Sequence, residues 1–91
     1  MGLKTTTQCL GYQQITSLSA STALTVPAGA TMALIIPELQ GVRWRDDGTA
    51  PTATVGMPLA AGTSLSYDGD LKAIRFIQQA ATGYLNVSYY A

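Results

Sequence analysis

Histidine is absent from this sequence, and cysteine occurs once, at Cys9. Without histidine the chain lacks the usual general base, the Ser-His-Asp and Cys-His arrangements, and the commonest transition-metal ligand. A single cysteine excludes an internal disulfide and a cysteine-rich zinc site, so we expect Cys9 to be a small buried hydrophobic residue. These absences predict a protein that is not an enzyme and that carries no metal and no cofactor.

Charged side chains are also scarce. The five basic and five acidic residues make up 11% of the 91 residues and cancel, whereas soluble domains contain roughly 25% charged residues. Because lysine and arginine form no cluster, the positive footprint of a nucleic-acid-binding protein is missing. One interpretation is a protein of merely low charge. The interpretation we favour is that other subunits, including further copies in a homo-oligomer, cover much of the surface.

The sequence does not indicate a membrane segment. Lys4 precedes a polar stretch at residues 5–8, where a secretory signal would have a continuous apolar run. The most apolar window, residues 32–36, is far too short to cross a bilayer. The sequence therefore predicts synthesis in the cytoplasm and no membrane partner.

Helical periodicity is hard to find, because glycine, proline and threonine interrupt nearly every window long enough for three turns. Strand patterns bounded by turn residues are frequent instead. They cover residues 8–15, 23–26, 31–36, 38–45, 54–57, 64–67, 71–78 and 84–90. This spacing is typical of one small antiparallel β-sandwich over residues 1–91, of jelly-roll or immunoglobulin-like topology, or of a small barrel.

The alternation within these patterns predicts which side chains share a face. Val42 and Trp44 fall on one side of their strand, which we take as the core side, and Arg43 and Arg45 fall on the other. In the following patterns, Ile74 and Phe76 share a face with Lys72, and Leu85, Val87 and Tyr89 alternate with their neighbours.

Four of the five acidic side chains, Asp46, Asp47, Asp68 and Asp70, lie in glycine-containing segments that favour tight turns. Paired carboxylates can act as acid and base, but turn formation explains these positions better. Residues 49–62, after the first of these turns, carry no charge and are predicted to form a loop. Such a loop is expected to lie against the sandwich or against a neighbouring subunit.

Three groups of side chains are candidates for contact with a partner. Arg43 and Arg45 can bind an anion or a partner's carboxylate, or pair locally with Asp46 or Asp47. The tyrosines can stack on sugars or form the centre of an interface, and Tyr89 and Tyr90 cannot both point inward from one strand. With two apolar residues of the uncharged loop, the candidate interface consists of Arg43, Arg45, Met57, Leu59, Tyr89 and Tyr90.

Three stretches carry a resemblance to a known group of proteins: VRWRDDGTAPTATVGMPL at residues 42–59, GDLKAIRFI at 69–77 and LNVSYY at 85–90. Together they resemble small structural proteins encoded by tailed bacteriophages and prophages, typically among virion genes. The resemblance implies a location in the virion and a β-sandwich that assembles on capsid or tail subunits, after synthesis in the cytoplasm of the bacterial host. It carries over no catalytic or binding residue.

The function expected from these observations is that of a capsid decoration or cement protein. Such a protein bridges capsid subunits in many symmetric copies, so that weak single contacts add up. Two alternatives stay open. One is a tail or neck adaptor or fibre-associated protein, and the other is a carbohydrate-binding module in which tyrosines stack on sugar rings.

Overall fold

The computed structural model describes residues 7–91, which form eight β-strands. No helix in this part of the chain is long and apolar enough to cross a membrane. The strands are β1 (Cys9–Ile15), β2 (Thr22–Ala23), β3 (Met32–Glu38), β4 (Val42–Arg45), β5 (Met57–Leu59), β6 (Leu65–Tyr67), β7 (Arg75–Gln78) and β8 (Tyr84–Tyr90).

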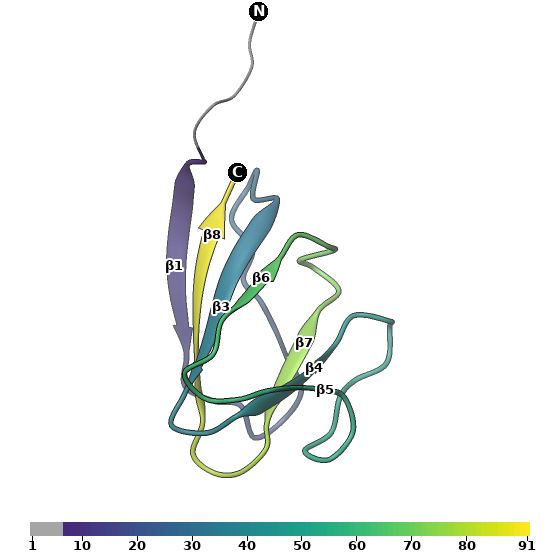
Figure 1. Cartoon of the computed structure of the whole chain (residues 1–91). Helices are drawn as coiled ribbons and strands as arrows, with labels where there is room; N and C mark the ends of the chain where they lie inside the picture. The colour runs from purple at the N-terminus through teal and green to yellow at the C-terminus, as the bar shows by residue number, and fades with distance from the viewer. Residues whose placement is uncertain (1–6) are drawn as a thin grey trace, which may run out of the picture.

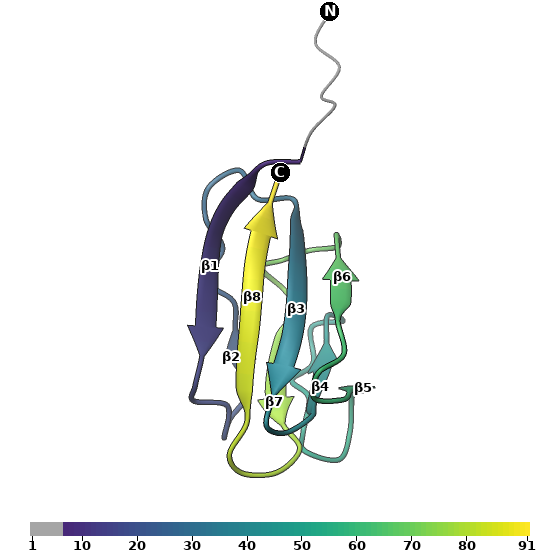
Figure 2. The same cartoon turned by 60° about the vertical axis from the view of Figure 1, so that its left-hand side comes forward.

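The strands pair as a long hairpin rolled into two antiparallel sheets (Figures 1 and 2). The first sheet has the order β1-β8-β3-β6 and the second the order β2-β7-β4-β5. Each strand of the first half is thus beside its counterpart in the second half: β1 pairs with β8, β2 with β7, β3 with β6 and β4 with β5. Eight strands in this order form a jelly roll. The predicted antiparallel sandwich is confirmed, with the first of the two named topologies.

The core lies between the two sheets and follows the two-residue period of the strands. The first sheet contributes Ile35, Leu85, Val87 and Tyr89, and the second contributes Val42 and Phe76, all at most 1% exposed. The predicted alternation along β8 is therefore confirmed, and Leu85, Val87 and Tyr89 lie on its inner side. Trp44 is half-buried and packs against this core, as its predicted face requires.

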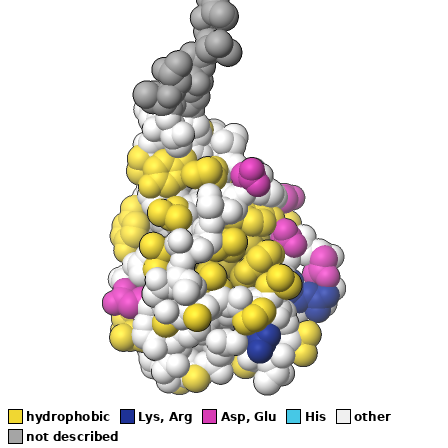
Figure 3. Space-filling view, in the orientation of Figure 1, with side chains coloured by type: hydrophobic (Ala, Val, Ile, Leu, Met, Phe, Trp, Pro, Cys, Tyr) yellow, Lys and Arg dark blue, Asp and Glu magenta, His cyan; other side chains and the backbone are white. Residues whose placement is uncertain are grey.

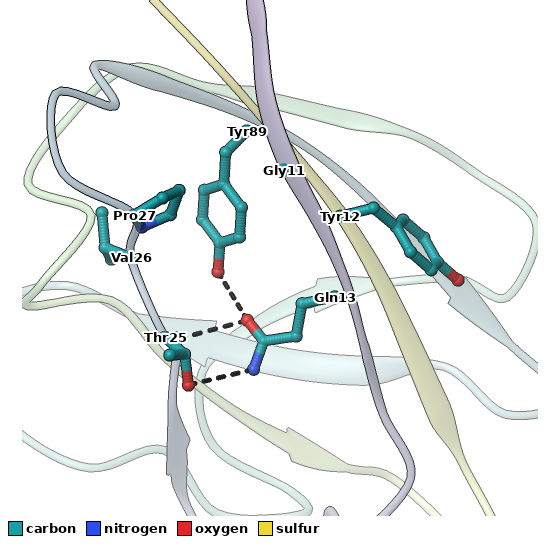
Figure 4. A pocket seen from close by; sticks show the side chains of 7 residues that line it. All are labelled: Gly11, Tyr12, Gln13, Thr25, Val26, Pro27 and Tyr89. Atoms are coloured by element: carbon teal, nitrogen blue, oxygen red, sulfur yellow. Dashed lines mark hydrogen bonds between the residues drawn. The ribbon is translucent and has the colours of Figure 1, made fainter.

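Two buried tyrosines tie the sheets together near the open sides of the sandwich. On one side, the Tyr89 hydroxyl donates to Gln13 Oε1 at 2.6 Å, and Gln13 is also hydrogen-bonded to Thr25 (Figure 4). On the other side, the Tyr67 hydroxyl donates to Asp46 Oδ2 at 2.6 Å, and the Tyr67 ring meets Trp44 edge-on. The Tyr67 bond joins β6 of the first sheet to the segment after β4 of the second. The Tyr89 bond joins β8 to β1 within the first sheet, and Gln13 in turn reaches Thr25 in the segment after β2.

Four predicted strands are markedly shorter or shifted in the structure. The pattern over 38–45 is interrupted, because Leu39 takes a left-handed φ of 73° and starts a turn before β4. The pattern over 71–78 yields only β7, because the Asp70 carbonyl accepts from the amides of Ala73 and Ile74 in a turn. Lys72 is exposed in this turn and does not share the face of Ile74 and Phe76, so that prediction is wrong.

The predicted strand 23–26 is also reduced, to Thr22 and Ala23, because Thr25 turns away to bind Gln13. The short strand expected at 54–57 lies at Met57–Leu59. Cys9 is exposed at the start of an edge strand, so its predicted burial is wrong. Its outward position follows from its pairing with Tyr90, whose side chain points away from the core.

The alternation along β3 provides a matched test of the fold. Ile35 is fully buried, whereas the adjacent Leu34 is half-buried on the opposite face. Ile35→Ala is expected to lower the free energy of unfolding by about 2–4 kcal/mol, because it leaves a cavity in the core. Leu34→Ala is expected to lower it by less than about 1 kcal/mol, because little of that side chain's burial comes from the core. Chemical denaturation measures both, and equal losses would contradict this assignment of faces.

The two buried tyrosines predict a loss of stability at high pH. Burial is the main cause that raises the pKa of Tyr67 and that of Tyr89 to about 12, from 10.0 for an exposed tyrosine. Below pH 10 both hydroxyls stay protonated in the folded and the unfolded chain. Between pH 10 and 12 the unfolded chain releases these protons first, so stability falls.

Thermal unfolding across this pH range measures the effect, and the tyrosinate absorbance of the folded protein reports the two pKa values. The double variant Tyr67→Phe, Tyr89→Phe is expected to show a weaker pH dependence. Titration of both residues in the folded chain near pH 10 would contradict the prediction.

Candidate interface on the first sheet

The six residues of the predicted interface do not lie on one surface. Arg43, Arg45, Met57 and Leu59 belong to β4 and β5 in the second sheet, whereas Tyr89 and Tyr90 belong to β8 in the first. Tyr89 is 1% exposed, so its prediction as a contact residue is wrong. Leu59 lies opposite Val42 and packs against the core. Tyr90 and Met57 remain accessible, on different sheets.

Both arginines of β4 make their contacts within the chain. The Arg45 guanidinium donates to both carboxylate oxygens of Asp47, at 3.0 and 2.5 Å, and thereby holds the pKa of Asp47 below its usual range. Arg43 donates to the backbone carbonyls of Ala53 and Gly56, and so holds the uncharged loop against the second sheet. The sequence left open whether the two arginines bind a partner or pair locally, and Arg45 pairs locally with Asp47.

The charged groups are distributed unevenly between the two sheets. The four strands of the first sheet contain one charged residue, Glu38, at the end of β3. The other charged residues in the described part of the chain lie in the second sheet or in loops. In Figure 3, most charged groups gather on the right, and uncharged and apolar side chains cover much of the remaining face. The first sheet therefore presents an almost uncharged surface.

The solvent-facing side of the first sheet is called the outer face below. Its members alternate with the buried residues of β1, β3, β6 and β8, and the pairing of the strands sets them in rows across the sheet. They are Tyr12, Gln14, Met32, Leu34, Ile36, Glu38, Ser66, Tyr84, Asn86, Ser88 and Tyr90.

Aliphatic side chains form the middle of the outer face. Met32, Leu34 and Ile36 point outward from β3, while Ala33 and Ile35 between them point into the core. A strand that is apolar on both faces is typical of a sheet covered on both faces. Here the second sheet covers only the inner one. The outer row is therefore a surface that can be removed from water by a partner.

A hydrogen-bonded network fixes the polar part of the outer face. Asn86 Oδ1 accepts from the Tyr12 hydroxyl at 2.6 Å and from Gln14 Nε2 at 3.2 Å, and Asn86 Nδ2 donates to Glu38 Oε1 at 3.1 Å. These bonds link β1, β8 and β3 across the sheet. Because the side chains satisfy one another, a partner that covers them leaves few unpaired polar groups.

The arrangement of side chains on the outer face suits contact with another protein. Tyr12 is 64% exposed and points away from the core (Figure 4), and the aliphatic row lies two strands away on the same face. Large aromatic and aliphatic side chains around a small satisfied polar network are typical of the central part of a protein–protein interface. Among residues 7–91, no three His, Cys, Asp or Glu side chains gather in an arrangement that holds a metal ion.

The sequence prediction missed the aliphatic row, although its signal was present. Residues 32–36 are the most apolar window, and an unbroken apolar run in a strand indicates that both faces are covered. Only the order of the strands shows which face of β3 packs against the second sheet and which face points outward.

No family model, no curated protein and no solved structure matches the chain in comparisons with known proteins. The candidate interface is thus identified from the composition and geometry of the outer face.

Proposed function

We propose that this chain is a non-enzymatic structural protein of a tailed-bacteriophage particle, a capsid decoration or cement protein that docks on virion subunits through the outer face. The observation that carries the proposal is the row of Met32, Leu34 and Ile36, which points outward from a sheet with a single charged residue. The location in a virion is supported by the sequence resemblance. The jelly roll is a fold of capsid proteins, and also of lectins and other proteins.

A single docking contact of this size is expected to be weak. Full removal of one large aliphatic side chain from water contributes about 1.5–3 kcal/mol, and the three in β3 are already half-buried. Association also costs several kcal/mol of lost translational and rotational freedom. Repetition on a symmetric particle offsets this weakness, because a capsid offers the same site many times and adjacent contacts support one another.

A specific observation also favours the carbohydrate-binding alternative. Tyr12, Tyr84 and Tyr90 share the outer face with the amides of Gln14 and Asn86, and aromatic rings beside amides can hold sugars. The aliphatic row argues for a protein partner instead, because Met32, Leu34 and Ile36 offer a sugar neither a stacking ring nor a hydrogen bond.

The proposal predicts that purified particles of the phage or prophage that encodes this chain contain it in many copies. Mass spectrometry of separated heads and tails is expected to find it in the head fraction. Its presence only in tails would support the adaptor alternative. Its absence from both fractions, together with specific binding to a glycan array, would replace the proposal with the carbohydrate-binding one.

A pair of charge substitutions tests the surface itself. Leu34→Glu places a carboxylate in the aliphatic row, whereas Met57→Glu places one on the second sheet, where the side chain is 56% exposed. Leu34→Glu is expected to weaken binding to particles that lack the protein at least about tenfold, because a buried charge must lose its hydration. Met57→Glu is expected to change binding by less than about twofold.

Binding of both variants is measured by co-sedimentation, after thermal unfolding has shown that each is folded. Unchanged binding of Leu34→Glu, or a loss confined to Met57→Glu, would contradict docking through the outer face.

A further inference from the structure

Within residues 7–91 the two sheets have four edge strands, of which β1 alone is long and free of charge and proline. The other three are two or three residues long, and β5 also contains Pro58, which has no amide to donate. β1 has seven residues, without a charge or a proline. Proteins usually shield edge strands by shortness, proline or charge, because an open edge is a template for another strand.

The structure shows which backbone groups of β1 are open. The Thr31 amide donates to the Tyr90 carbonyl, so the backbone of Tyr90 faces β3. Backbone direction alternates along an antiparallel strand, so the even-numbered residues of β8 face β3 and the odd-numbered ones face β1. Tyr12 and Gln14 lie opposite even-numbered residues of β8. Their N–H and C=O groups therefore point to the free edge.

The segment that runs beside β1 leaves this edge open. Thr25 is hydrogen-bonded to the side chain of Gln13, and none of the backbone hydrogen bonds of residues 25–27 in the described structure goes to β1. The strand is regular from Gly11 to Ile15, with its bulge before Gly11. Figure 2 shows β1 along the margin of the first sheet.

We propose that β1 is a self-association edge, at which the β1 strands of two copies pair antiparallel about a twofold axis at Gln13. Tyr12 of each copy then lies opposite Gln14 of the other, and the open N–H and C=O groups of these residues pair. The two first sheets become one continuous sheet of eight strands. This inference does not depend on which protein the outer face binds.

A second copy suits this edge better than an unrelated strand. Two identical strands are self-complementary about a twofold axis, and an uncharged strand brings no like charges together. Pairing centred on Gln13 uses the whole regular stretch and keeps both bulges outside the new ladder. It also joins the two outer faces side by side, because Tyr12 and Gln14 lie at the margin of that face.

The dimer is expected to be weak when free in solution, because pairing through one strand buries less than the roughly 1,200 Å² of a stable interface. We expect a dissociation constant on the order of 100 µM. Sedimentation equilibrium of the full chain from about 10 µM to 1 mM is expected to show conversion of monomer to dimer.

Amide hydrogen exchange by NMR over the same range locates the contact. The amides of Tyr12 and Gln14 are expected to become protected as concentration rises. The Gln13 amide, which lies opposite the odd-numbered Val87, faces β8 and is expected to be protected throughout. It serves as an internal control in the same strand.

Two substitutions of one residue separate the backbone from the side chain. Gln14→Pro and Gln14→Thr both remove the side-chain hydrogen bond from Gln14 Nε2 to Asn86. Only proline also removes the backbone N–H that points to the free edge. Gln14→Pro is expected to weaken dimerisation at least about tenfold, and Gln14→Thr less than about threefold.

A chain that stays monomeric at about 1 mM, with freely exchanging Tyr12 and Gln14 amides, would overturn the proposal. So would a dimer that Gln14→Pro leaves intact, or protection of these amides only after virion subunits are added. If Gln14→Pro does not fold, the amide exchange of the unsubstituted chain decides alone.

Discussion

In a sandwich of two sheets, each sheet has one face covered by the other sheet and one face that it leaves uncovered. This constraint affects β3 most, because β3 is apolar on both faces. Its inward residues Ala33 and Ile35 are fully buried against the second sheet. Its outward residues Met32, Leu34 and Ile36 are equally apolar, yet no part of the described chain covers them fully. The outer face of the first sheet therefore meets either water or a partner, and its apolar, nearly uncharged composition favours a partner.

The placement of the few charges follows the same division. The Arg45–Asp47 pair and the Arg43 contacts to the loop carbonyls keep charge on the second sheet, where it also organises the connection between β4 and β5. Glu38, the single charged residue in the strands of the first sheet, is bound by Asn86 within a network. The first sheet is thus left with little charge that would have to be desolvated on docking.

The sequence pattern predicts the three longest strands best. β1, β3 and β8 are seven residues long, and their predicted positions differ from the observed ones by no more than two residues at either end. β2 is shortened by the contact of Thr25 with Gln13, which no local pattern reports. β7 is shortened by the turn in which the Asp70 carbonyl accepts from the amides of Ala73 and Ile74. The candidate site is more difficult to predict from the sequence than the strands are. Whether Tyr89 or Tyr90 is exposed depends on which face of β8 packs against the second sheet.

The open edge of β1 and the apolar row of β3 are features of the same sheet, and this links the two proposed contacts. β8 lies between β1 and β3, and Asn86 at its outer surface holds Tyr12 and Glu38 on either side. Pairing of two β1 strands would therefore join two rigid outer faces without rearranging either. A joined pair binds a symmetric partner with two faces at once, so each weak contact raises the effective concentration for the other. A long uncharged edge, which is a liability in a solitary domain, then contributes to the strength of docking.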